Sequence, residues 1–220
     1  YKMSQLTLQF PFKKKYLKRE FYVSSNNFAA YELIENYPNW PGKCVNIFGP
    51  SGCGKTHLTK ILSDKININL VDAKNLKSNF IDLIQDFDCS IIDNYENNID
   101  EKLMYSIINQ SKQLEKNILI TSKKPLKNSE VKLKDLQSRS KSFIELGISL
   151  PTDDLLRVII SKYFSEKQIF LNKRNLEYIL KNIERSYDKV FKFIKEIDND
   201  SLSSGKSINI DLIKKNIRNE

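Results

Sequence analysis

Few residues of this 220-residue chain could build a disulfide scaffold or a zinc site, because it has three cysteines and one histidine. Cys44, Cys53 and Cys89 are odd in number and far apart, whereas disulfide scaffolds and zinc sites place such residues in pairs at short spacing. The sequence therefore argues against both, and it is typical of a protein from a reducing compartment.

Long apolar runs are also missing. No stretch approaches the roughly 20 residues that a membrane span needs, and the N-terminal residues lack the apolar core of a secretory signal. Hydrophobic residues still make up 40% of the chain and aromatic residues 10%, which is enough for a packed core. We therefore expect a folded cytoplasmic protein with no membrane partner.

Acidic residues are outnumbered: 27 face 36 lysines and arginines, which gives a net charge of +9. Such an excess is compatible with nucleic acid, acidic proteins or phosphate ligands as partners. A solvated surface rich in lysine would give the same total. The charge alone therefore leaves the partner open.

The order of the expected elements predicts an α/β protein with a parallel sheet and a second, helical part. Strands are expected at 45–48, 68–71, 90–92, 118–121 and 143–146. One helix is expected before the first strand, at 27–35, and others between the strands, at 55–62, 76–85 and 101–113. Alternation of this kind is typical of a parallel sheet that helices cover on both faces, and its strands should be apolar throughout, as these are.

After Pro151 the sequence contains helical patterns alone, at 153–166, 173–183, 187–198 and 209–217. Their apolar stripes are expected to include Phe164, Ile169, Phe170 and Phe191. We thus expect an N-terminal arm at 1–22, an α/β nucleotide-binding domain at 23–150 and a small helical lid domain at 151–220.

Residues 49–56 fit the phosphate-loop pattern G-x-x-x-x-G-K-[ST] in full, as Gly49-Pro50-Ser51-Gly52-Cys53-Gly54-Lys55-Thr56. A strand is expected before the loop and a helix after it, so main-chain N–H groups and the positive end of the helix dipole would surround a phosphate. Lys55 would reach the terminal phosphates and Thr56 would bind Mg²⁺. We expect Cys53 to fill space and His57 to border the nucleotide without acting as a catalyst. The expected ligand is ADP or ATP with Mg²⁺.

An apolar strand ending in Asp93 supplies a carboxylate that could hold the water shell of the Mg²⁺ ion opposite Thr56. The next residue is Asn94, which can hydrogen-bond a water molecule but cannot take its proton. Glu96 could replace it only if the loop folds back. Alternatively, the Asp-Asn pair is simply a turn at the end of a strand. The sequence predicts nucleotide binding and leaves open whether the chain hydrolyses ATP efficiently by itself.

Three further segments give the chain a resemblance to AAA+ ATPases, closest to the family of the bacterial initiator DnaA. They are Thr121-Ser122 at the end of the fourth expected strand, Leu136-Gln137-Ser138-Arg139 before the fifth, and residues 184–190 with Lys189. The resemblance implies that Ser122 is a sensor near the γ-phosphate and that Arg139 is an arginine finger acting in trans. It places Lys189 at the second sensor position, where the family usually has an arginine; lysine lacks the bidentate fork. Arg139 could instead be a surface residue paired with Asp135 or Glu130.

The N-terminal arm carries Gln5-Leu6-Thr7-Leu8-Gln9-Phe10, which resembles the clamp-binding hexapeptide of Hda-type AAA+ proteins. Gln5 would supply amide hydrogen bonds, and Leu6, Leu8 and Phe10 would enter an apolar groove. Gln9 departs from the pattern, since Hda proteins commonly have proline there. An ordinary edge strand would show the same alternation. The residues up to Glu220 also leave no room for the DNA-reading domain of DnaA.

The Hda-type resemblance implies a regulatory adaptor that binds the DNA polymerase III β sliding clamp and promotes hydrolysis of ATP bound to DnaA. It would contact DNA only indirectly and restrain re-initiation of replication. The alternatives are an autonomous replication ATPase of the helicase or clamp-loader type, and an initiator paralogue whose lysines grip DNA. Self-association stays open.

Overall fold

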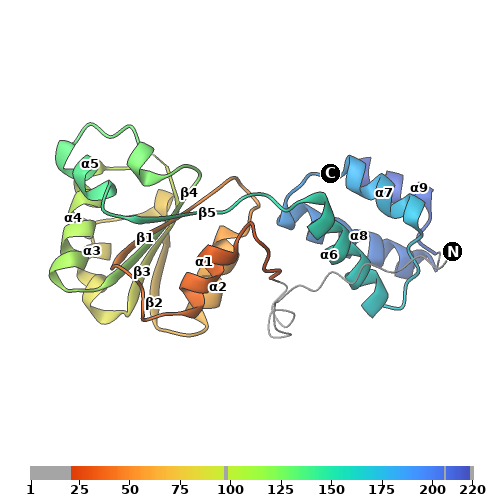
Figure 1. Cartoon of the computed structure of the whole chain (residues 1–220), viewed down its shortest axis with the longest axis horizontal. Helices are drawn as coiled ribbons and strands as arrows, with labels where there is room; N and C mark the ends of the chain where they lie inside the picture. Colours follow the sequence, from red (N-terminus) through yellow and green to blue (C-terminus); the bar gives the residue numbers. More distant parts are fainter. Residues whose placement is uncertain (1–20, 97–98, 206, 219–220) are drawn as a thin grey trace.

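The computed structural model describes residues 21–96, 99–205 and 207–218. It contains a five-stranded parallel sheet with helices on both faces, followed by a group of four helices (Figure 1). The predicted fold class is confirmed. The hexapeptide with Gln5, Leu6, Leu8 and Phe10 lies outside the described residues.

Because the sheet is parallel, all its strands end on the same side. Its order is β2-β3-β4-β1-β5 and every neighbouring pair is parallel. In β1 the buried Asn46 donates through Nδ2 to the Ile120 carbonyl oxygen and to Ser122 Oγ, both at 2.9 Å, which fixes the end of β4 beside the end of β1. The strands are β1 (Cys44–Phe48), β2 (Ile68–Asp72), β3 (Cys89–Tyr95), β4 (Asn117–Ser122) and β5 (Ile144–Gly147).

Helices cover the two faces of the sheet with separate apolar clusters (Figure 1). On one side lie α1 (Phe28–Glu35) and α2 (Lys55–Ser63), packed against the sheet through Ile34, Leu58 and Leu62. On the other lie α3 (Phe80–Leu83), α4 (Glu101–Gln113) and α5 (Lys134–Ser140), packed through Met104 and Ile107. Burying each such side chain stabilises the fold by about 1.5–3 kcal/mol.

The single helix predicted at 76–85 is wrong. The segment forms only the short helix α3, preceded by the 3₁₀ turn η2 (Ala73–Asn75) and followed by the 3₁₀ turn η3 (Ile84–Asp86). Polar turn-forming residues precede Phe80, and the Asp72 side chain accepts a hydrogen bond from the Lys74 N–H and so caps η2 instead of a longer helix. A third turn, η4 (Leu126–Asn128), follows β4.

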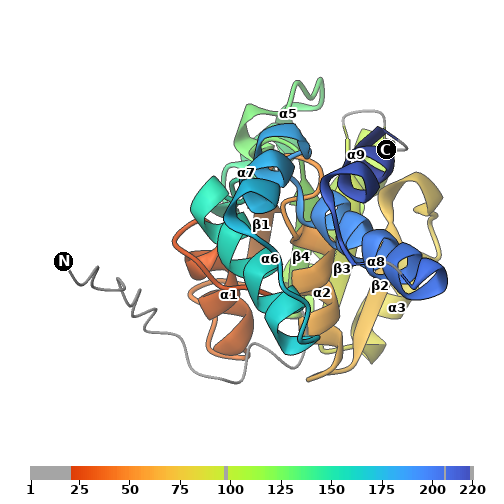
Figure 2. The same ribbon diagram turned by 90° about the vertical axis from the view of Figure 1, so that its right-hand side faces the viewer.

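The C-terminal part forms its own apolar core from α6 (Asp153–Glu166), α7 (Lys173–Asn182), α8 (Tyr187–Ser204) and α9 (Ile210–Arg218). Figure 2 shows these helices grouped in front of the sheet. Phe164 and Phe193 are fully buried in this core. Phe170 is 86% exposed, so its predicted place in an apolar stripe is wrong: it lies in the connection after α6, where Ile169 and Leu171 contact the core instead.

Helix α8 continues six residues beyond its predicted end, because the first residue that stops it is Gly205, with φ of +63°. No helix within the described parts of the chain is long and apolar enough to span a bilayer.

Candidate nucleotide site

The loop between β1 and α2 has a backbone that only small residues allow. Gly52 and Gly54 have φ of +73° and +101°, in the left-handed region that favours glycine. A Cβ atom on Gly49 would lie 2.2 Å from the Ile148 carbonyl oxygen. The loop therefore wraps closely around the N-terminus of α2, where main-chain N–H groups and the helix dipole favour an anion.

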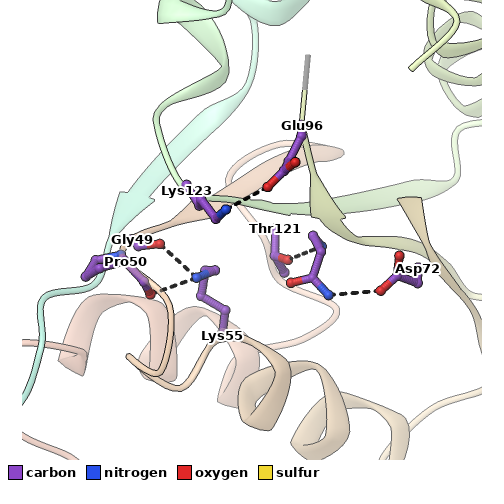
Figure 3. A network of polar contacts seen from close by, with 8 residues as sticks. Gly49, Pro50, Lys55, Asp72, Glu96, Thr121 and Lys123 are labelled. Carbon is purple, nitrogen blue, oxygen red and sulfur yellow. Dashed lines mark hydrogen bonds and ion pairs between the residues drawn. The ribbon is translucent and has the colours of Figure 1, made fainter. Parts of the chain in front are cut away.

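Lys55, the first residue of α2, is held inside this loop. Its Nζ donates to the carbonyl oxygens of Gly49 at 2.7 Å and Pro50 at 3.0 Å (Figure 3), and its side chain is almost fully buried. Cys53 Sγ lies 3.9 Å from Nζ. Burial raises the pKa of the Cys53 thiol, and the positive charge of Lys55 opposes this only in part. Cys53 is thus a neutral, buried filler beside a buried ammonium group.

Asp93 lies opposite the start of α2. Thr56 Oγ1 donates to Asp93 Oδ2 at 2.9 Å, and the hydroxyl of Thr121 donates to the other carboxylate oxygen. Asp93 is only 6% exposed. A hydroxyl and a carboxylate in contact fit Mg²⁺, which is usually bound by one or two protein oxygens together with water and phosphate. Within the described residues no group of three acidic, cysteine or histidine side chains gathers to form an all-protein metal cage.

Asn94 is turned toward the neighbouring strand. It has φ of +59° at an irregularity of β3, its N–H donates to Thr121 Oγ1 at 2.9 Å, and its Nδ2 donates to Asp72 Oδ2 at 3.1 Å. The hydrogen bond from Asn94 lowers the pKa of Asp72. Thr121 and Asp72, the two residues that Asn94 bonds, are labelled in Figure 3. The residue after Asp93 is therefore fixed in place by its neighbours and offers no proton acceptor of carboxylate strength.

Glu96, the other candidate to take a proton, is paired. Its carboxylate lies 2.7 Å from Lys123 Nζ, and both side chains are more than half exposed (Figure 3). The loop thus does fold back toward β4, but the carboxylate meets a lysine there.

A cavity of about 420 Å³ joins these groups. Its volume is in the range of small-molecule sites. Its walls come from the phosphate loop and α2, the ends of β3 and β4, the segment before α1, and the start of α8. The lining residues are Phe21, Tyr22, Ser51, Gly52, Gly54, Lys55, Thr56, His57, Asn94, Tyr95, Glu96, Ser122, Lys123, Tyr187, Asp188 and Phe191.

One side of the cavity is aromatic. The ring centroids of Phe21 and His57 lie 5.1 Å apart, and those of Tyr22 and Phe191 lie 6.2 Å apart. Flat apolar rings beside a phosphate loop suit a nucleotide base, which presents a π-face to any aromatic neighbour. The cavity therefore offers a cationic end and an aromatic side.

The start of α8 packs directly on the phosphate loop. The Tyr187 N–H donates to the Gly52 carbonyl oxygen at 3.0 Å, and a Cβ atom on Gly52 would lie only 2.4 Å from Ser186 Cβ. Asn27 Nδ2 donates to the Tyr187 hydroxyl at 3.4 Å, and burial raises the pKa of Tyr187 to about 12. The helical part and the sheet part thus meet at the loop itself.

The predicted site residues fall into three groups. Those that line the cavity are Ser51, Gly52, Gly54, Lys55, Thr56, His57 and Ser122. Those that shape the loop or hold Thr56 without lining it are Gly49, Pro50, Cys53 and Asp93. Lys189 does not line the cavity: its N–H donates to Ser186 Oγ, and Asp188 lines the wall instead.

Sequence reasoning missed the aromatic side, which comes from Phe21, Tyr22, Tyr187 and Phe191. The only signal in the sequence is the spacing of Tyr187 and Phe191, four residues apart on one helix face. It does not indicate that this face meets residues 21 and 22.

Arg139 lies on the side of the sheet where the strands begin, whereas Lys55 lies on the side where they end. It is on α5, five residues before β5, and close enough to Cys44, the first residue of β1, for its charge to act on that thiol. Burial raises the pKa of Cys44, while the positive charges of Lys112 and Arg139 oppose the increase. Among the residues that the structure describes, the Arg139 guanidinium has no hydrogen-bond or ion-pair partner, so it does not pair with Asp135 or Glu130.

Comparison with known proteins agrees with this architecture. A family model described as RNA helicase matches residues 45–143, which run from β1 to just before β5 and include the phosphate loop and Asp93. The search of curated proteins found no match.

Solved structures show the fold. Domain III of the replication initiation protein DnaA from Thermotoga maritima matches with a TM-score of 0.75 and 17% identity, over 96% of this chain and 98% of that one. AMPPCP-bound DnaA from Aquifex aeolicus matches with a TM-score of 0.65 and 22% identity, over 81% of this chain and 63% of that one. The RuvB Holliday junction branch migration motor from Thermotoga maritima matches with a TM-score of 0.63 and 21% identity, over 80% and 61%. The chain thus has an AAA+ fold like that of DnaA domain III.

Proposed function

We propose that this chain binds ADP or ATP with Mg²⁺ in the cavity between the phosphate loop and α8. The observation that carries the proposal is that Lys55 and Thr56 line one end of a cavity with an aromatic side, where Asp93 accepts a hydrogen bond from Thr56. Lys55 would contact the terminal phosphates, Thr56 and Asp93 would hold the Mg²⁺ ion, and Phe21 and Phe191 would lie nearest the base. Bound Mg²⁺ neutralises phosphate charge. The likeness to an AMPPCP-bound DnaA supports an adenine nucleotide.

The chain is proposed to act mainly as a regulator, with weak ATP turnover of its own. An attacking water needs a group that orients it and takes its proton. Asn94 is bonded to Asp72, and Glu96 is paired with Lys123. Neither arrangement provides a free carboxylate beside Asp93.

Its proposed target is ATP bound to DnaA. We infer that Arg139, whose guanidinium has no hydrogen-bond or ion-pair partner among the described residues, would enter the nucleotide site of a neighbouring molecule. An arginine supplied in trans accelerates phosphoryl transfer by ~10³–10⁵. The hexapeptide Gln5–Phe10 would dock the chain on the DNA polymerase III β sliding clamp, with DNA contacted only indirectly.

The proposal is tested by measuring hydrolysis of DnaA-bound ATP in the presence of the loaded clamp. Arg139→Ala should end the stimulation while leaving nucleotide and clamp binding unchanged, because only a transition-state contact is lost. Replacing Leu8 and Phe10 together by alanine should abolish clamp binding and leave nucleotide binding intact.

The matched control is Arg174→Ala, which removes an exposed arginine from α7 and should leave the stimulation unchanged. Full stimulation by the Arg139 variant would overturn the finger role. Unchanged clamp binding by the double variant would remove the arm from the proposal.

A second candidate is an autonomous P-loop ATPase, which the match to an RNA helicase model and the likeness to the RuvB motor favour. Rapid ATP turnover by the purified chain with no partner would select this candidate. Strong, salt-dependent binding to duplex DNA would instead favour an initiator paralogue.

A further inference from the structure

We propose that α4 holds α5 at both ends, and that Glu101 and Lys112 are positioning residues for Arg139. The inference rests on the trans-acting role of Arg139 proposed above. It concerns how a side chain at the end of a two-turn helix is held at a fixed place.

The first contact between α4 and α5 is made by Glu101, at the start of α4. One of its carboxylate oxygens accepts the Lys132 N–H at 2.9 Å, and the other accepts the Leu133 N–H at 2.7 Å. Leu133 is the N-cap of α5 and has no side chain able to cap it. Glu101 thus satisfies the N-cap N–H as the glutamate of a capping box does, but from a different helix. Hydrogen bonds to a charged acceptor are about twice as strong as neutral ones.

The second contact is made by Lys112, in the last turn of α4. Its Nζ donates to Ser142 Oγ at 3.0 Å, and Ser142 Oγ donates to the Arg139 carbonyl oxygen at 2.7 Å. Between the two ends, Leu136 is buried in the cluster that contains Met104 of α4. Helix α5 is therefore held by α4 at its start, its middle and its end.

A helix as short as α5, with seven residues, is not stable by itself, so its orientation has to come from what it packs on. The backbone of Arg139 is fixed by this packing, while its guanidinium has no partner among the described residues. The positive charges of Lys112 and Arg139 both act on the thiol of Cys44, at the start of β1. The fixed backbone of Arg139 therefore sets the point from which its partly buried side chain starts.

The test compares Glu101→Ala with Glu130→Ala, which removes an exposed glutamate from the loop just before Lys132. Stimulation of DnaA-bound ATP hydrolysis is measured against the concentration of this chain. Glu101→Ala should lower the maximal rate by roughly 10- to 100-fold, because small misplacements of a catalytic group have effects of this size, with the half-saturating concentration unchanged. Glu101→Gln, which keeps one acceptor, should fall between the two.

Lys112→Met should lower the maximal rate in the same way, with Lys102→Met, an exposed lysine of the same helix, as its control. This second pair decides the matter if Glu101→Ala does not fold. Hydrogen exchange at the Lys132 and Leu133 amides should rise in Glu101→Ala, and the order parameter of the Arg139 Nε–H should fall. These two readouts do not depend on DnaA.

The outcomes separate the two proposals. If Arg139→Ala leaves the stimulation intact, the finger role fails, whatever result the Glu101 and Lys112 variants give. If Arg139→Ala ends the stimulation while both Glu101→Ala and Lys112→Met keep the full maximal rate, the positioning role of α4 is overturned. The positioning role of α4 is supported if Glu101→Ala and Lys112→Met lower the maximal rate and cause no further loss when combined with Arg139→Ala.

Discussion

Tyr187 links the stability of the fold to alkaline pH through one buried hydroxyl. Its pKa is raised to about 12 by burial, whereas an exposed tyrosine ionises near 10. Between these values the unfolded chain releases this proton and the folded chain keeps it. Its contribution is fully present below pH ~10 and is lost as pH rises toward 12, a loss of about 3 kcal/mol in the free energy of unfolding.

Urea unfolding of the wild type and Tyr187→Phe at pH 9 to 11.5 measures this contribution. Burial also raises the pKa values of Tyr37 and Tyr95, so both proteins should lose stability, and the wild type should lose more. Equal slopes against pH in the two proteins would contradict the assignment.

The sequence was sufficient for the phosphate end of the site and not for the base end. Lys55 and Thr56 follow one another in a motif whose chemistry depends on local backbone shape, and Asp93 comes directly after the apolar residues of β3. Phe21 and Phe191 are 170 positions apart, and their proximity depends on where α8 docks on the loop. No spacing in one sequence encodes that docking.

At the scale of elements, the contact between Gly52 and the start of α8 predicts an unequal effect of two similar substitutions. Gly52 and Gly205 have φ of +73° and +63°, so alanine at either position costs roughly 1–2 kcal/mol of backbone strain. A Cβ atom on Gly52 would meet Ser186 at 2.4 Å, while one on Gly205 meets nothing within 4 Å. Gly52→Ala should therefore lower the free energy of unfolding more than Gly205→Ala.

Urea unfolding of the two variants side by side provides the measurement, with Gly205→Ala as the control for backbone strain alone. Gly52→Ala should also weaken nucleotide binding, because it moves α8 relative to the loop. Equal losses of stability would show that the start of α8 does not press on Gly52.

Elements with strong end signals were predicted at their observed limits. Helix α4 starts after Asp100, whose side chain caps two N–H groups, and α6 starts after Thr152, which caps one. Residues 76–85 have neither a clear cap nor a continuous apolar face, and in place of one long helix they form the short helix α3 and the start of the 3₁₀ turn η3. No element was predicted over the residues of α5, because a seven-residue helix held by another helix has little periodicity of its own.

At the scale of the whole molecule, the cavity has walls from both the sheet part and the helical part, so a bound nucleotide should stabilise the two together. ADP with Mg²⁺ at 100 times its Kd would add about 2.7 kcal/mol to the free energy of unfolding. For a chain of this size the Tm should rise by roughly 5–10 °C.

Thermal unfolding with and without ADP and Mg²⁺ measures the shift, and calorimetric titration gives the Kd. Lys55→Met should remove most of the shift, while Lys60→Met, an exposed lysine of α2, should keep it. An unchanged Tm and no heat of binding in the wild type would refute nucleotide binding altogether.

The left-handed backbone of Asn94 limits which residues this position accepts. Asparagine tolerates this conformation better than most residues do, and a glutamate there would pay backbone strain and face the carboxylate of Asp72. Under the proposed function, Asn94→Glu alone is therefore not expected to raise ATP turnover by the purified chain. A carboxylate at position 94 would therefore also require a change at position 72, where the Asp72 carboxylate now accepts a hydrogen bond from Asn94.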